Sequence, residues 1–229
     1  MTKQKIRYSL KFFLSEIKSP WELAVFWSKN KELIDMEVEE TTNPIMVLPG
    51  FLFNDLYTKP LRKLLGKKGL SCYGWEMGIN KGFSWSKVDK LKTRVRELHQ
   101  EHGEPVILIG WSLGGVYARE LSRHAPEDVK FPITLASPFH IPSRTPINLI
   151  YRLIAGHKLQ DLNFLMAQHR ETEFPVPVFA LNAKKDGIIP WPCCLAPGNR
   201  TVKSLVFEAT HLGLPHNKKV AKKILENLC

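Results

Sequence analysis

The sequence lacks a long uninterrupted apolar run, and this absence argues against an integral membrane protein. No stretch approaches the roughly 20 consecutive apolar residues that a membrane-spanning helix needs. Lys3, Lys5 and Arg7 precede an apolar segment, as in a secretory signal, but Lys11 and Glu16 interrupt it and no small-residue cleavage site follows. We therefore expect a mature chain that is located in the cytoplasm.

Cysteine is also scarce, with four among 229 residues. Cys193 and Cys194 are adjacent, Cys72 stands alone and Cys229 is the last residue, which does not suit a disulfide framework. No paired C-x-x-C spacing indicates zinc. We expect incidental thiols and no metal site.

Acidic residues are too few to balance the basic ones, which leaves a formal net charge of +11. The basic residues are spread along the chain, and no aromatic-interleaved basic stripe or zinc-finger spacing accompanies them, so we expect no nucleic-acid partner. The charge fits a solvated basic surface. It also fits attraction to anionic lipid or to an acidic substrate, and charge alone does not decide between them.

The first forty residues have a helical pattern, which predicts a helical N-terminal extension over 1–40. Ile6, Leu10, Phe13, Leu14 and Ile17 recur at helical spacing. A second amphipathic helix is expected to begin at 19–22, a helix-start pattern, and to run to about residue 34. These helices either dock on the domain or lie on a membrane surface.

From residue 43 onward, short apolar runs alternate with helical stretches. The predicted strands are 45–48, 106–109, 133–136, 176–181 and 205–207, with 70–75 as a weaker candidate. Apolar faces predict helices around 88–98, 116–121 and 220–228. This alternation is typical of a mostly parallel sheet covered by helices on both faces, and we expect residues 1–229 to form a single α/β domain.

Residues 137–174 depart from this alternation. The segment opens with Pro138, Pro142 and Pro146 and continues with a helical apolar pattern. An insert after a late strand is expected above the carboxyl ends of the strands, where open α/β sheets bind ligands. The segment is therefore a candidate cap or lid, although ordinary helical packing without a gating role would give the same pattern.

The strongest functional signal is a G-x-S-x-G motif centred on Ser112. It follows an apolar strand and precedes an apolar-faced helix, which is the context of a nucleophile elbow rather than of an ordinary glycine-rich turn. Gly110 and Gly114 supply the space that the sharp turn needs. The backbone N–H of Leu113 is then a candidate oxyanion donor near the helix start.

A serine hydroxyl needs a base to accept its proton, and a histidine after the last strand suits this role. His211 stands directly after the run 205–207, and we predict that it is the base. His216 is the competitor, although it follows Pro215 and is expected to cap or begin the last helix. His124 lies at the end of the elbow helix, away from the strand tips.

The acid that orients the base is expected in the loop after the preceding strand. Asp186 is the only carboxylate between that strand and the final one, although an Asp-Gly turn without a catalytic role would look the same. Asp161 and Glu208 are the reserves. A second oxyanion donor is expected after the strand 45–48, where the N–H of Phe51 is the candidate and that of Leu52 the alternative.

The chain resembles the bacterial lipase and esterase-like members of the α/β-hydrolase superfamily. The resemblance spans roughly residues 43–228 and is carried by the motifs at 48–52, 74–80, 110–115, 133–139, 185–191 and 211–214. It implies a triad of Ser112, Asp186 and His211, no cofactor, and a shortened sheet of about six strands. In one departure, Pro49-Gly50 stands where many relatives have His-Gly.

The leading hypothesis is a serine carboxylic-ester hydrolase that acts on a small-molecule ester with an apolar acyl group. Leu52, Trp111 and Phe139 are the candidate pocket residues. A second hypothesis is a lipase or acyltransferase with the same triad, in peripheral contact with an anionic membrane surface. A third is a non-catalytic binding protein that retains the fold.

Overall fold

The computed structural model describes residues 10–18, 26, 31–36 and 41–228. Ile6, Cys229 and the predicted helix start at 19–22 lie outside the described residues. Within the described N-terminal part, α1 (Leu10–Ser15) continues into the short 3-10 helix η1 (Glu16–Lys18), and α3 (Lys31–Asp35) falls at the end of the second predicted helix. None of the helices in the described part of the chain has the length and apolar character of a membrane span.

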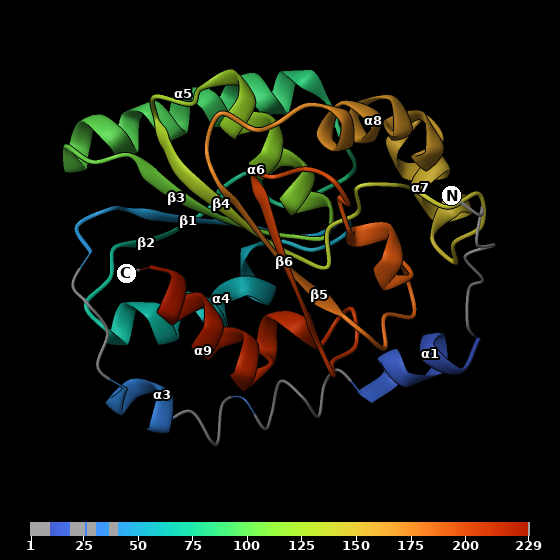
Figure 1. Ribbon diagram of the computed structural model, residues 1–229, viewed down its shortest axis with the longest axis horizontal. Helices are drawn as coiled ribbons and strands as arrows, with labels where there is room; N and C mark the ends of the chain where they lie inside the picture. The colour runs from blue at the N-terminus through green and yellow to red at the C-terminus, as the bar shows by residue number, and fades with distance from the viewer. Residues whose placement is uncertain (1–9, 19–25, 27–30, 37–40, 229) are drawn as a thin grey trace.

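A six-stranded parallel sheet forms the centre of the molecule, in the order β2-β1-β3-β4-β5-β6 (Figure 1). Its strands are β1 (Ile45–Leu48), β2 (Cys72–Gly74), β3 (Val106–Trp111), β4 (Val129–Leu135), β5 (Val178–Ala183) and β6 (Val202–Phe207). Each predicted strand is present, and the predicted parallel sheet of about six strands is confirmed. Within the described residues, no strand precedes β1.

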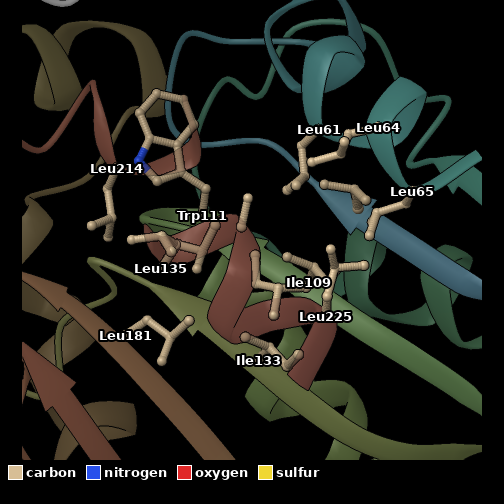
Figure 2. Close-up of a cluster of buried hydrophobic side chains, with 14 of the residues drawn as sticks. Leu61, Leu64, Leu65, Ile109, Trp111, Ile133, Leu135, Leu181, Leu214 and Leu225 are labelled. Atoms are coloured by element: carbon tan, nitrogen blue, oxygen red, sulfur yellow. The ribbon is translucent and has the colours of Figure 1, made fainter. Parts of the chain in front are cut away.

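Both faces of the sheet are covered by helices, as predicted (Figure 1). α5 (Trp85–His102) and α6 (Leu113–His124) pack on one face, and α4 (Asp55–Lys67) and α9 (Lys218–Asn227) on the other. Because strand side chains alternate, Ile45 of β1 joins the core under α4 and α9 while Met46 joins the core under α5 and α6. Figure 2 shows leucines of α4 and α9 gathered around Ile109 and Ile133 of the central strands.

α4 is the main element that the sequence pattern does not predict. Pro60 lies inside it, and a proline normally indicates that a helix ends. The helix is nevertheless well specified: the Asn54 side chain caps its first turn by accepting from the N–H of Leu56 at 3.0 Å. Leu61, Leu64 and Leu65 are then buried against the sheet. The free energy gained by burying these side chains outweighs the loss of the one backbone hydrogen bond that proline removes.

β6 is an edge strand, and it is more exposed to solvent than the predicted covering of both sheet faces by helices would imply. Leu205 and Val206 are each 42% exposed, and Lys203 and Ser204 are exposed as well. The charged and polar side chains suit an edge, because they discourage pairing with another strand.

The chain segment between β4 and β5 contains the predicted insert 137–174. It includes α7 (Asn148–Ala155), the 3-10 helix η2 (Leu159–Leu162) and α8 (Asn163–Glu171). Arg119 of α6 is fully buried and donates to the Ser137 hydroxyl at 3.1 Å, to the Pro138 carbonyl at 2.6 Å and to His169 of α8 at 3.1 Å. The neighbouring Glu120 also bonds His169. The insert is thus tied to the helix that begins directly after Ser112.

The strand order places the candidate residues at one point of the sheet. β1 pairs with β2 on one side and with β3 on the other, so the order in which strands are added to the sheet reverses between β1 and β3. Ligands of open α/β sheets bind outside the carboxyl ends of the strands at such a switch point. Phe51 follows β1 and Ser112 follows β3, and both therefore lie at this point.

Candidate active site

Ser112 occupies a strained turn between β3 and α6. Its backbone has φ 53° and ψ −117°, in a region that non-glycine residues rarely enter. Such a conformation costs about 1–3 kcal/mol and persists only where its surroundings impose it.

The glycines on either side of Ser112 make this turn sterically possible. A Cβ at Gly110 would collide with the carbonyl of Gly114, and one at Gly114 would collide with the backbone of Leu48 on β1. Strand and helix therefore approach so closely that only hydrogen fits at both positions. The turn needs glycine at both positions because the backbones of the strand and the helix are in direct contact.

Ser112, His211 and Asp186 lie in one hydrogen-bonded chain. The Ser112 Oγ is 3.0 Å from Nε2 of His211, and Nδ1 of His211 is 2.6 Å from Oδ2 of Asp186. Oδ1 of Asp186 accepts from the N–H groups of Ile188 and Ile189 at 2.9 and 2.7 Å. Since the carboxylate accepts from Nδ1, Nε2 is left to accept the proton of the serine hydroxyl.

All three side chains are shielded from water, so solvent only weakly screens the electrostatic interactions among them. Burial disfavours the charged imidazole of His211, but the Asp186 carboxylate and, to a smaller extent, Glu16 together outweigh burial and raise the pKa of His211 above its ordinary 6.5. The site therefore favours a proton on His211 when one is transferred from Ser112.

The loop that carries His211 is anchored through its backbone. The carbonyl of His211 accepts from the indole N–H of Trp111 at 3.1 Å, and the carbonyl of Leu212 accepts from the Tyr57 hydroxyl at 2.7 Å. The N–H groups of these two residues donate to the Glu16 carboxylate, each at 2.9 Å. Glu16 was not singled out from the sequence, where it appears only as a charge that interrupts an apolar run.

The loop after β1 is shaped by Asn80, which lies in the motif 74–80. Asn80 is buried and donates from its side chain to the Pro49 carbonyl at 2.9 Å, while its own carbonyl accepts from the N–H of Leu52 at 2.8 Å. The N–H of Leu52 is thus occupied. In the part of the chain that the structure describes, the N–H groups of Phe51 and Leu113 have no acceptor.

Two cavities meet at Ser112, and Phe51 and Ile147 also line both of them. The larger, of about 180 Å³, has His211 in its wall and is lined by Gly50, Phe51, Leu52, Phe53, Trp111, Ser112, Ile147, Ile188, His211 and Leu212. The smaller, of about 20 Å³, is lined by Phe51, Ser112, Leu113, Val116, Pro138, Ile141, Ile147, Tyr151, Leu159, Leu162 and Ile189. The smaller cavity lies largely against the insert, and no charged side chain lines it.

Leu52 and Trp111 line the larger cavity, whereas Phe139 lines neither of these two cavities, so they do not support its prediction as a pocket residue. Phe139 is fully buried and lies 4.2 Å beneath the Arg119 guanidinium, in a separate core cluster with Phe174 and Val178. The chain turns after Ala136, and the bonds from Arg119 hold the following loop against α6.

The alternatives considered from the sequence lie apart from the serine. His216 precedes α9 in the 3-10 helix η4 (Leu214–His216), where it packs edge-on against Tyr57, and burial lowers its pKa to about 4. Asp161 accepts from the N–H of Lys158 in the insert. Glu208 is exposed and pairs with Lys184 and Lys185 at 2.7 and 3.2 Å.

The thiols and ionisable clusters offer little further chemistry. Cys72, Cys193 and Cys194 are free, and burial raises the pKa of Cys72 and of Cys193 to about 12. Neutral thiols of this kind are poor nucleophiles. Within the described ranges, no group of three or more His, Cys, Asp or Glu side chains is arranged to hold a metal ion.

Comparisons with known proteins identify the fold. No protein-family model matches the chain, and no curated protein matches its sequence. Among solved structures, a lipase-esterase related protein from Clostridium acetobutylicum is 18% identical with a TM-score of 0.61, covering 83% of this chain and 96% of that one. The mature lipase BlEst2 from Bacillus licheniformis is 16% identical with a TM-score of 0.60, covering 84% and 95%.

A pyrethroid hydrolase from Sphingobium faniae is similar at 16% identity, with a TM-score of 0.54 over 81% of this chain and 97% of that one. At these identities the likeness establishes the fold. The chain has the α/β-hydrolase fold that its motifs predict.

The close approach at the elbow makes a prediction about stability. Gly114→Ala is expected to destabilise the protein by about 3 kcal/mol or more, because the added Cβ meets backbone that cannot move aside. Gly66→Ala is the control, since Gly66 also lies in a helix and a Cβ there meets nothing within 4 Å. Urea unfolding of both variants measures the difference. Equal stability of the two would contradict the steric account.

Proposed function

We propose that the protein is a carboxylic-ester hydrolase that works through an acyl-enzyme on Ser112. The observation that carries the proposal is the buried chain of hydrogen bonds from Ser112 through His211 to Asp186 at the carboxyl ends of the strands. The α/β-hydrolase fold supports it, since the similar structures include proteins described as a lipase and a pyrethroid hydrolase.

In the first half of the reaction, the Ser112 Oγ attacks the ester carbonyl carbon while Nε2 of His211 takes the hydroxyl proton. The carbonyl oxygen becomes an oxyanion, and Asp186 stabilises the imidazolium that forms. When the tetrahedral intermediate collapses, the bond to the alcohol oxygen breaks and His211 gives its proton to the leaving alcohol. Ser112 is left acylated.

In the second half, water takes the place of the alcohol. His211 removes a proton from the water, the hydroxide oxygen attacks the acyl carbon, and the bond to Oγ breaks as His211 returns the proton to Ser112. The products are the carboxylic acid and the free enzyme.

The backbone N–H groups of Phe51 and Leu113 are the proposed oxyanion donors. Both are left without an acceptor by the described residues, whereas the N–H of Leu52 is bonded to Asn80. The N–H of Leu113 also lies at the first turn of α6, where the helix dipole favours a negative charge. We therefore propose the N–H of Phe51, rather than that of Leu52, as the second oxyanion donor.

The two cavities distinguish the acyl side of the substrate from the alcohol side. The leaving alcohol must lie beside His211, because His211 protonates it. His211 lines only the larger cavity, while Leu113 lines only the smaller one. We therefore assign the alcohol to the larger cavity and the acyl chain to the smaller, insert-lined cavity.

The size of the smaller cavity restricts the acyl chain. Its volume of about 20 Å³ is close to that needed by a single water molecule. Its walls are mainly apolar, so the site suits a short, uncharged acyl group joined to a larger apolar alcohol. Leu162 and Ile141 of the insert line the cavity and are the specificity-determining residues in this assignment.

A second candidate function, a lipase or acyltransferase acting at a membrane surface, is favoured by one observation. α7 and α8 expose large apolar side chains: Leu149 at 69%, Leu153 at 75% and Phe164 at 73%. With a net charge of +11, such a surface suits an anionic lipid interface. A non-catalytic role is the third possibility, and it is disfavoured by the hydrogen-bonded Ser112.

Replacement of the nucleophile tests the leading proposal. Ser112→Ala is expected to abolish hydrolysis of p-nitrophenyl acetate, with a loss on the order of 10³-fold or more in kcat, because no acyl-enzyme can form. Ser204→Ala, at an exposed serine of β6, is the control and is expected to retain wild-type activity. Unchanged hydrolysis by a folded Ser112→Ala variant would refute the mechanism.

Two isomeric esters test the assignment of the cavities. Hexyl acetate is expected to exceed ethyl hexanoate in kcat/KM by about tenfold or more, because the smaller cavity suits a two-carbon acyl group better than a six-carbon one. Leu162→Ala is expected to narrow this gap, because it opens the cavity wall.

Leu165→Ala is the matched control, because Leu165 is buried in the same insert but lines neither cavity. It should leave the ratio unchanged. A wild-type preference for ethyl hexanoate, or equal responses of the two variants, would reject the assignment.

Vesicle binding separates the surface-active candidate from the first. If the exposed face of α7 meets lipid, the protein should co-sediment with anionic phosphatidylglycerol vesicles at low salt and less so at high salt. Leu149→Ser with Leu153→Ser should weaken the binding, since both side chains are exposed. Absence of wild-type binding at low salt would count against this candidate.

A further inference from the structure

Glu16 is a buried carboxylate from the N-terminal segment that reaches the catalytic loops. It begins η1 and is only 6% exposed. In the sequence it lies far from both Asp186 and His211, and no local pattern connects the three.

The Glu16 carboxylate bonds the two loops at once. Its Oε1 accepts from the N–H of Gly187 at 2.8 Å and from the N–H of His211 at 2.9 Å, while its Oε2 accepts from the N–H of Leu212 at 2.9 Å. Gly187 directly follows Asp186. Because both oxygens act only as acceptors, the arrangement matches an ionised carboxylate.

These bonds complete the anchoring of the histidine loop. The carbonyls of His211 and Leu212 are held by Trp111 and Tyr57, and Glu16 supplies the acceptors for the two N–H groups. Glu16 is the member of this set that also binds the loop carrying the acid, so it fixes His211 and Asp186 relative to each other.

A second observation shows how closely the N-terminal segment is seated. A Cβ at Gly187 would collide with the backbone of Phe12 and lie 2.5 Å from the Cα of Phe13. The glycine after Asp186 therefore leaves room for α1 to pack on the acid loop. This contact is made by Phe12 and Phe13 and not by the Glu16 side chain.

Charge adds a further link between Glu16 and the base. The ionisable groups that face His211 from the described chain are Asp186, from the loop after β5, and Glu16, from η1. The negative charge of Glu16 favours the imidazolium and contributes to the raised pKa of His211. Burial in turn raises the pKa of Glu16, against the lowering effect of His211 and the three N–H donors.

We propose that Glu16 is a positioning residue of the Ser112 site, which holds the loops of Asp186 and His211 together and stabilises the imidazolium formed during the reaction. The N-terminal segment is then part of the active site and not only an extension of the domain. This inference rests on the proposed function for its catalytic consequence.

The test is Glu16→Gln, which keeps the size of the side chain and removes its charge. Two quantities are measured against pH: the titration of the His211 ring protons by NMR and the kcat/KM for p-nitrophenyl acetate. Both midpoints are expected to move to lower pH, because the imidazolium loses a stabilising charge. At the optimum, kcat should fall by about tenfold or more with little change in KM, since misplaced catalytic groups slow the chemical step.

Glu32→Gln is the matched control. Glu32 also lies in the N-terminal part of the chain, but its side chain is 89% exposed, and among the described residues it pairs with Lys218 alone, at 3.8 Å. It is expected to reproduce the wild-type titration and rates. Gly187→Ala is the second perturbation: it keeps the Glu16 charge, pushes the segment away from the acid loop, and is expected to lower kcat.

A Glu16→Gln variant with the wild-type His211 titration and the wild-type kcat would overturn the inference. If that variant does not fold, a wild-type kcat in Gly187→Ala would overturn it instead. The NMR titration needs no substrate, so it also separates the two proposals. Inactive wild-type protein whose His211 titration still responds to Glu16→Gln would refute the ester hydrolase and support the Glu16 link.

Discussion

The structure of the site depends on the close backbone contact between β3, α6 and β1 around Ser112. Because Gly110 and Gly114 lack a Cβ, the strand can turn directly into the helix, and the serine is held at φ 53°. This turn places the Oγ beside His211, and no acceptor for the N–H of Leu113 lies among the residues that the structure describes. The packing of the sheet supplies the energy that holds a strained residue in place.

The other candidate groups reach this point from separate strands, and side chains from still other elements hold them. Asp186 follows β5, His211 follows β6, and their loops are joined by the carboxylate of Glu16. The insert closes one side of the site and is fastened to α6 by the buried Arg119. The proposed acyl specificity and the proposed role of Glu16 both follow from these attachments.

Much of this arrangement could be predicted from the sequence, because the signals are local. A glycine pattern around Ser112, a single carboxylate after one strand and a histidine after the next identify the residues that the structure brings together. β1, β3, β4 and β5 could be predicted because each contains a short buried apolar run. The sequence pattern did not predict α4, because Pro60 indicates a helix end whereas burial of apolar side chains stabilises the helix.

The contacts that sequence reasoning missed are non-local. Glu16 has no neighbour in sequence that reveals its partners, and the burial of Phe139 beneath Arg119 depends on how the insert folds back. Asn80 likewise acts through the distant Pro49. The N-terminal helical pattern indicated either docking or membrane contact, and the packing of Phe12 on Gly187 together with the hydrogen bonds of Glu16 shows contact with the domain.

The most direct test of the central claim, that His211 activates Ser112, is labelling with a fluorophosphonate probe followed by peptide mass spectrometry. The account predicts one adduct, on the peptide that contains Ser112, and its loss in a folded His211→Ala variant. Absence of any adduct on folded wild-type protein, or undiminished labelling of Ser112 without His211, would contradict it.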